Sequence, residues 1–267
     1  MYTYKQLIAE AIGTFFLCFA GIGAIVATSE PINSGVGLLG IALAHGLALS
    51  IAVSIFAGIC GAHFNPAVTI GFLTTGRIPA LQAVMYIAAQ LVGAILAAAA
   101  CQAIYPASAV DASMLGIPLP AAWVTTPVLL LTEFILTFLL MTAIYGTAVD
   151  ERAAPMKLGG FGIGLAVTFD ILAAGKVTGA SMNPARSFGP AIVHSYFTSQ
   201  WWCYWVAPIA GAVVAALLYE HLLLVKDEEL EKAYERVLLA SSTRAPITRA
   251  SMILSCSAAI GLPSFGQ

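Results

Sequence analysis

Six stretches of this 267-residue chain are apolar over about 20 residues, the length that a helix needs to cross the hydrocarbon core of a membrane. Two further apolar stretches are too short to cross it. Only 9% of the residues are charged, against about 25% in a soluble domain, so burial in a membrane is the direct explanation. The sequence therefore predicts an all-α membrane protein. The long stretches cover approximately 6–28, 36–57, 82–104, 125–149, 158–175 and 202–225, and the short ones 65–75 and 183–193.

Both short stretches begin with Asn-Pro-Ala, at Asn65-Pro66-Ala67 and at Asn183-Pro184-Ala185. Asn is a favoured N-cap, and Pro suits the first helical position because its missing N–H costs nothing there. A single copy would also fit an ordinary capped loop. Two copies in matching surroundings favour two short helices.

The surroundings match because the chain is an internal repeat. Each half contains three long stretches and one short stretch, and each half has a glutamate early in its first long stretch. An odd number of spans turns the second half upside down in the membrane, so the two short helices enter from opposite faces and meet at the midplane. We expect a channel domain over 1–225, with halves at about 1–115 and 116–225, and a tail over 226–267. Pairs that match between the halves are Gly61 and Gly179, Ala62 and Ala180, Gly71 and Gly189, and Glu10 and Glu133.

The distribution of positive charge predicts the orientation. Of the eleven Lys and Arg residues, all except Lys176 and Arg186 lie on one side of this topology, which the positive-inside rule assigns to the cytoplasm. The first apolar stretch could instead belong to a signal peptide. It is as long as a span, and no small-residue cleavage site follows it, so we interpret it as the first transmembrane helix. We expect a multi-pass protein of the cell membrane with both termini in the cytoplasm.

Non-helical backbone at membrane depth needs partners for its polar groups, and the segments 59–64 and 176–182 are such backbone. A file of water molecules would supply these partners. Each short helix directs about half a positive charge at the midplane, where Asn65 and Asn183 add side-chain N–H donors. A water molecule there offers its oxygen to both amides, which interrupts the hydrogen-bonded wire that protons need. This arrangement predicts passage of water and exclusion of ions.

Three carboxylates lie inside the apolar stretches, where an unpaired charge is costly. Glu10 and Glu133 could relay protons or bind cations, or they could accept hydrogen bonds from the backbone N–H groups of the non-helical segments. We favour the second interpretation because no chain of titratable residues links them. Asp170 could accept a hydrogen bond from loop backbone or pair with Lys176, or it could be a structural acceptor that faces away from the pore, and we favour the last interpretation.

The segments Gly61–Thr69 and Gly179–Ala191 resemble the two signature loops of the major intrinsic protein (aquaporin) family, and the resemblance covers roughly 5–225. It implies a passive channel, built as a homotetramer with one pore per subunit. It implies no enzymatic activity, no cofactor and no metal. The five scattered cysteines form no CxxC pair, and the net charge of −2 gives no sign of a nucleic-acid partner.

The resemblance also implies a selectivity filter of four residues: His45, Ile171, Ala180 and Arg186. A lone intramembrane histidine such as His45 could equally be a packed core residue. This filter is most similar to that of the tonoplast intrinsic proteins, some of which pass ammonia, urea or hydrogen peroxide besides water. Glycerol facilitators usually have Asp where this chain has Ser187. The loop 105–127 contains no His that could add a fifth filter residue.

Two other function classes fit this sequence less well than a channel does. A coupled secondary transporter would need titratable residues at the midplane, where this chain has Asn, Pro and Ala. An intramembrane enzyme would need a nucleophile–base pair near the pore, and none is apparent.

In the tail, the spacing of apolar residues over 226–240 predicts an amphipathic surface helix. The segment that begins at Ser241 could form a regulatory site.

Overall fold

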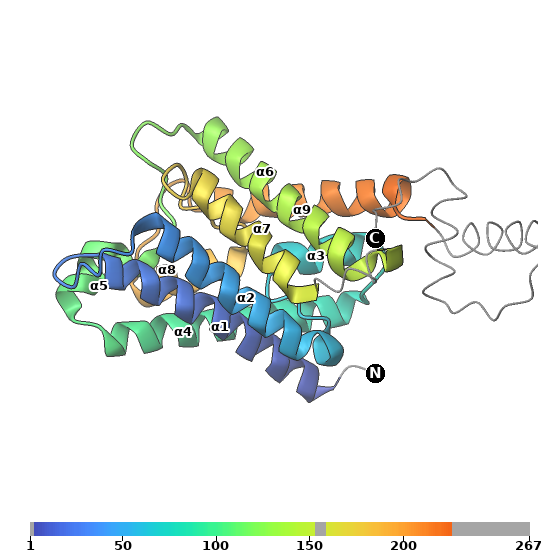
Figure 1. Cartoon of the computed structure of the whole chain (residues 1–267), viewed down its shortest axis with the longest axis horizontal. Coiled ribbons are helices and arrows are strands. Elements are labelled where there is room, and N and C mark those ends of the chain that lie inside the picture. Colours follow the sequence, from blue (N-terminus) through green and yellow to red (C-terminus); the bar gives the residue numbers. More distant parts are fainter. Residues whose placement is uncertain (1–2, 153–158, 226–267) are drawn as a thin grey trace, which may run out of the picture.

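The structure, a computed structural model, describes residues 3–152 and 159–225. Figure 1 shows a bundle of long helices that lie side by side. The first half contains α1 (Tyr4–Thr28), α2 (Gly37–Cys60), α3 (Pro66–Thr74) and α4 (Ala80–Ile104). The loop between the halves holds α5 (Ala107–Ser113) and the 3₁₀ turn η1 (Met114–Gly116). The second half contains α6 (Thr126–Ile144), η2 (Tyr145–Val149), α7 (Gly159–Ala174), α8 (Pro184–Val193), α9 (Cys203–Leu218) and η4 (Tyr219–Leu223).

The predicted all-helical membrane fold is confirmed, with one difference in length. Within the described residues, five helices are long and apolar enough to cross a membrane: α1, α2, α4, α6 continued by η2, and α9 continued by η4. The sixth predicted span, 158–175, is present as α7, whose described part has 16 residues and follows directly after the undescribed residues 153–158. The short helices α3 and α8 contact both halves, since α3 packs on α9 and α8 on α4.

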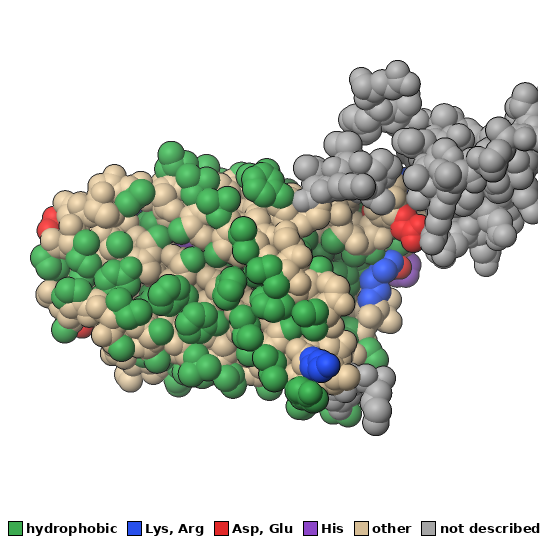
Figure 2. All heavy atoms as spheres, turned by 60° about the horizontal axis from the view of Figure 1, so that its bottom comes forward, with side chains coloured by type: hydrophobic (Ala, Val, Ile, Leu, Met, Phe, Trp, Pro, Cys, Tyr) green, Lys and Arg blue, Asp and Glu red, His purple; other side chains and the backbone are tan. Residues whose placement is uncertain are grey.

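The start of α1 and the end of η4 lie at the same side of the bundle, at the right of Figure 1. We call this the terminal side, and the side of α5 and η1 the opposite side. Figure 2 shows a face covered by hydrophobic side chains, with charged side chains near the two ends. Large apolar residues such as Leu47, Ile51 and Ile55 of α2 are about half exposed. Such a face suits contact with lipid chains. The predicted tail helix, 226–240, lies outside the described residues.

Both short helices begin as the sequence predicts. The Asn65 side chain accepts a hydrogen bond from the N–H of Ala67, and the Asn183 side chain accepts from the N–H groups of Ala185 and Arg186. Each asparagine is thus an N-cap with proline directly after it. The loops before them share an unusual backbone: Gly61 and Gly179 have φ of +83° and +84°, and two further residues in each loop also have positive φ. The two re-entrant loops therefore repeat the same conformation.

Helices α2 and α7 pack backbone to backbone around two glycines. A Cβ atom added to Gly164 would lie 1.9 Å from Ser50 Oγ and 2.1 Å from the Gly46 carbonyl oxygen. A Cβ atom added to Gly46 would lie 1.9 Å from Thr168 Oγ1. Small residues at such crossings are typical of membrane helices, because close approach maximises van der Waals contact.

We predict that Gly164→Ala destabilises the fold, because its methyl group has no room between α7 and α2. Overpacking of this kind costs about 1–3 kcal/mol of unfolding free energy. Gly58→Ala is the matched control, since a Cβ atom at Gly58 meets nothing within 4 Å. The thermal unfolding midpoints of both variants in detergent test this. Equal midpoints would contradict the packing described.

Candidate functional site

Two cavities run into the bundle and share part of their lining. The larger, of about 230 Å³, extends from Arg77 on the terminal side past Asn65 and Asn183. The smaller, of about 190 Å³, opens on the opposite side next to Lys176. The residues that line both are His45, Ile171 and Arg186. Three of the four residues expected to form a filter therefore lie where the cavities meet, and the fourth, Ala180, lines the larger one.

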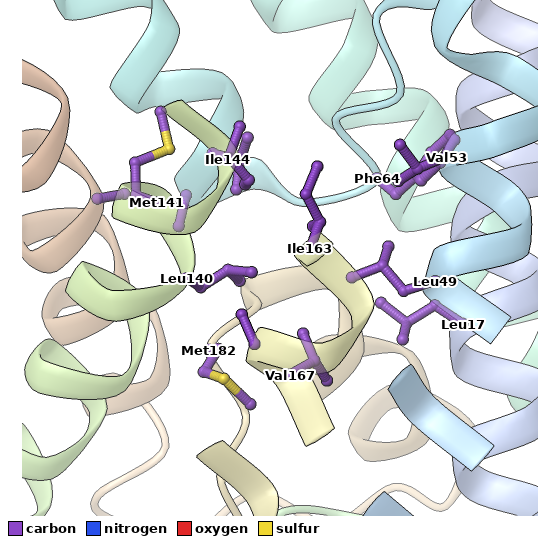
Figure 3. Packing of buried hydrophobic residues seen from close by; sticks show 14 of the residues in the cluster. Leu17, Leu49, Val53, Phe64, Leu140, Met141, Ile144, Ile163, Val167 and Met182 are labelled. Atoms are coloured by element: carbon purple, nitrogen blue, oxygen red, sulfur yellow. The ribbon is translucent and has the colours of Figure 1, made fainter. Parts of the chain in front are cut away.

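The wall of the larger cavity is mainly apolar. Figure 3 shows how side chains of α1, α2, α6 and α7 converge on this region, together with Phe64 and Met182 from the two re-entrant loops. Leu17, Leu49 and Val167 are among those that line the cavity. Side chains of this kind offer no hydrogen bond, so polar contacts are confined to a few positions along the path.

Asn65 and Asn183 tie the two re-entrant loops together. Asn65 Nδ2 donates to the carbonyl of Met182 at 2.9 Å, and Asn183 Nδ2 donates to the carbonyl of Phe64 at 2.9 Å. Each amide oxygen caps its own helix, so the orientation of both amides is defined by their partners. An amide nitrogen carries two hydrogens, and these bonds use one of them. The second remains for a molecule in the cavity that both asparagines line.

Glu10 and Glu133 are fully buried and support the two loops. Glu10 accepts hydrogen bonds from the N–H groups of His63 and Phe64, at 2.9 and 2.8 Å, and a third from Gln90 at 2.7 Å. Glu133 accepts from the N–H groups of Ser181 and Met182, at 3.0 and 2.8 Å, and from the Thr178 hydroxyl at 2.7 Å. All these partners are donors, as the loop-support interpretation requires.

The Arg186 side chain is held by the loop between the halves. Its Nη1 donates to the carbonyl of Gly116 at 2.8 Å, while no residue that the structure describes bonds its Nε. Gly116 has φ of +69° and follows two residues that also have positive φ. This loop contains no histidine, and the contact with Gly116 could not be predicted from the sequence because a backbone acceptor leaves no signal in residue type.

His45 has a defined tautomer in this structure. Its Nδ1 lies 2.8 Å from the carbonyl oxygen of Ile41, one turn earlier in α2. A carbonyl oxygen only accepts, so Nδ1 carries the hydrogen and the Nε2 of the neutral ring is an acceptor. Where the two cavities meet, His45 can therefore accept a hydrogen bond and Arg186 can donate one.

Asp170 has neither partner that the sequence suggested. Both of its carboxylate oxygens are buried without a hydrogen-bond partner among the described residues, and the ion pairs found there do not include Lys176. The N–H groups of Ser181 and Met182 in the second re-entrant loop are bonded to Glu133. Asp170 is absent from the lining of both cavities, which fits the interpretation that it faces away from the path.

Charged residues at the terminal side connect the two halves. Arg77, which lines the larger cavity, forms two hydrogen bonds with Glu220 at the end of the second half. Nearby, burial alone would raise the pKa of the Asp150 carboxyl, but the hydrogen bonds and charge of Arg152 outweigh burial and hold that pKa below its ordinary value. Asp150 is therefore charged at neutral pH. From the sequence alone, these basic residues indicated only the orientation of the chain in the membrane.

We predict that Glu133→Gln and Asp170→Asn differ sharply, although both replace a buried carboxylate by an amide. The first puts an NH₂ group against a loop N–H and should cost about 1–3 kcal/mol of unfolding free energy. The second breaks no protein hydrogen bond and should leave the thermal midpoint equal or higher. The thermal unfolding midpoints of both variants in detergent test this prediction. A drop for Asp170→Asn as large as that for Glu133→Gln would show that Asp170 has a partner.

Comparison with known proteins gives consistent matches along most of the chain. The family described as Major intrinsic protein matches residues 1–219. The chain is 40% identical to aquaporin TIP4-4 of Zea mays over 228 residues, covering 83% of this chain and 88% of that protein. It is 40% identical to nodulin-26 of Glycine max over 215 residues, covering 80% and 76%. Among solved structures, the aquaglyceroporin from Plasmodium falciparum superposes with a TM-score of 0.76 at 27% identity, covering 82% of this chain and 96% of that one.

Proposed function

The chain belongs to the major intrinsic protein family, and we propose that it conducts water together with small neutral solutes such as ammonia or hydrogen peroxide, while it excludes protons and ions. It is a multi-pass membrane channel and not an enzyme. The proposal concerns the solutes and the residues that select them. The observation that carries it is the pair of asparagine amides, which line the cavity where the two short helices meet.

Ion exclusion rests on charges that point into the path. The N-termini of α3 and α8 direct about half a positive charge each toward the region of Asn65 and Asn183. Arg186 adds a full positive charge where the cavities meet, and Asp and Glu are absent from the lining of either cavity in the described part of the chain. A cation therefore meets repulsion twice. A neutral molecule meets donors that it can satisfy.

The choice among neutral solutes rests on the four filter residues. Arg186 donates hydrogen bonds and His45 accepts one, so a passing molecule should do both. Ile171 and Ala180 add no side-chain hydrogen bond, which leaves one wall apolar. Water, ammonia and hydrogen peroxide are small and can both donate and accept. Glycerol needs more donors and a longer apolar wall than these residues offer.

The proposed function also involves the assembly of the subunits and their orientation in the membrane. We propose a homotetramer with one path per subunit, in the cell membrane, with the terminal side in the cytoplasm. The half-exposed apolar side chains of α2 suit contact with lipid or with a second subunit. The channel domain spans 1–225, and 226–267 forms a cytoplasmic tail. The balance of Lys and Arg supports this orientation.

We predict that Arg186→Val admits protons and larger solutes, because it removes the charge and the bulk at the narrow point. Proton leak should rise several-fold in liposomes that carry the variant. Lys176→Met is the matched control, since Lys176 lines only the smaller cavity. This variant should leave the proton leak unchanged. If Arg186→Val behaves like the parent protein, the place of Arg186 in the filter is wrong.

The solute range itself is the main test. In stopped-flow measurements on proteoliposomes, we expect water flux with measurable ammonia or peroxide flux and little glycerol flux. Replacing Ile171 by His and Ala180 by Cys should suppress ammonia and peroxide more than water, because both bulk and polarity return to the filter. Glycerol flux equal to water flux, or rejection of every solute except water, would overturn this assignment of the filter.

A further inference from the structure

Helix α1 approaches the proposed filter through a single glycine, Gly21. A Cβ atom added to Gly21 would lie 2.1 Å from Nε2 of His45 and 2.5 Å from both its Cδ2 and its Cε1. Real Cβ atoms essentially never come within 3.0 Å of another heavy atom. The His45 ring therefore occupies the volume that any larger residue at position 21 would need.

The three distances also define how the ring lies. A point at 2.1 Å along the lone pair of Nε2 would be much farther from the two ring carbons than from the nitrogen. Distances of 2.5 Å to both carbons place the point above the ring instead, so the face of the imidazole lies on the backbone of α1 at Gly21. The lone pair of Nε2 stays free, while Nδ1 is bonded to the Ile41 carbonyl. The ring is fixed by one hydrogen bond and one flat contact.

The position that corresponds to Gly21 in the second half of the chain has a different arrangement. At the same offset that relates Glu133 to Glu10, Gly21 corresponds to Ile144 in α6, and Ile144 itself lines the larger cavity. In α1 the position lacks a side chain, and a residue of α2 reaches across it to the path. The contact between Gly21 and His45 is therefore a feature of the filter end of the first half.

We propose that Gly21 is a positioning residue that sets the width of the filter, by letting the His45 ring lie against α1 and away from Arg186. This inference rests on the proposed role of His45 in the filter. A methyl group at position 21 displaces the ring from α1, and the cavities that His45 lines are the open space available to it. The path narrows at the level of His45, Ile171 and Arg186. Solutes larger than water lose passage first.

The experiment compares Gly21→Ala, His45→Ala and the double variant in proteoliposomes, with water, ammonia and hydrogen peroxide as probes. Gly23→Ala is the matched control on the same helix, because the nearest atoms to its Cβ would belong to Tyr105, with the hydroxyl at 3.2 Å and two ring carbons at 3.9 and 4.0 Å. We expect Gly21→Ala to reduce ammonia and peroxide flux about tenfold, the size of an overpacking penalty of about 1.4 kcal/mol, with a smaller loss for water. Gly23→Ala should keep the parent fluxes.

The double variant separates a filter effect from a folding failure. Without the imidazole, the methyl group at position 21 has room, so Gly21→Ala with His45→Ala should fold and should match the fluxes of His45→Ala alone. A parent-like flux ratio in Gly21→Ala overturns the inference, and so does a double variant that stays impaired. If His45→Ala alone leaves the parent flux ratios unchanged, then the proposed filter itself fails.

Discussion

The whole arrangement depends on backbone N–H groups at membrane depth that no helix satisfies. In a lipid environment such groups cost several kcal/mol each when they are left unpaired, so the two re-entrant loops need built-in acceptors. Glu10 and Glu133 are those acceptors, and each takes two backbone N–H groups and one side-chain donor. A buried carboxylate is itself expensive, but three donors offset that cost. With the loop N–H groups satisfied by these carboxylates, one N–H hydrogen of each amide of Asn65 and Asn183 remains for the path.

Short helices can occupy the centre only if the long helices make room for them. Glycines supply that room: a Cβ atom on Gly71 of α3 would lie 3.3 Å from the backbone of Ala212, and one on Gly189 of α8 would lie 2.5 Å from the backbone of Ala94. These two glycines occupy matching positions in the repeat. The crossed bonds of Asn65 and Asn183 then join the two short helices end to end. Close packing and the asparagine bonds thus hold the two short helices in place between the long ones.

Local patterns in the sequence predicted what depends on local chemistry. The length of an apolar stretch predicts a span, and Asn-Pro predicts a helix start, because each reflects a property of a few adjacent residues. The repeat then led to the pairing of Glu10 with Glu133, although their loop contacts span about fifty residues. It could not reveal Gly116, whose carbonyl holds Arg186, or the contact of Gly21 with His45, since both depend on three-dimensional approach. For Asp170 the sequence offered Lys176 and the loop backbone as partners, but its carboxylate bonds neither among the described residues, and its absence from both cavity linings fits the favoured interpretation that it faces away from the path.

The inverted repeat also shows how the two ends of the path differ in their side chains. The filter positions have counterparts at the offset that relates Asn183 to Asn65, and all four counterparts line the larger cavity: Ile163, Val53, Ala62 and Val68. None of these side chains can donate or accept a hydrogen bond. The counterpart of Arg186 is Val68, so the terminal side has a related backbone without the cation. Apolar side chains of this kind can distinguish molecules only by size and by the cost of losing water, whereas His45 and Arg186 of the proposed filter can also distinguish them by hydrogen bonding. The two related backbones thus carry different side chains, apolar ones at the terminal side and the polar pair His45 and Arg186 at the proposed filter.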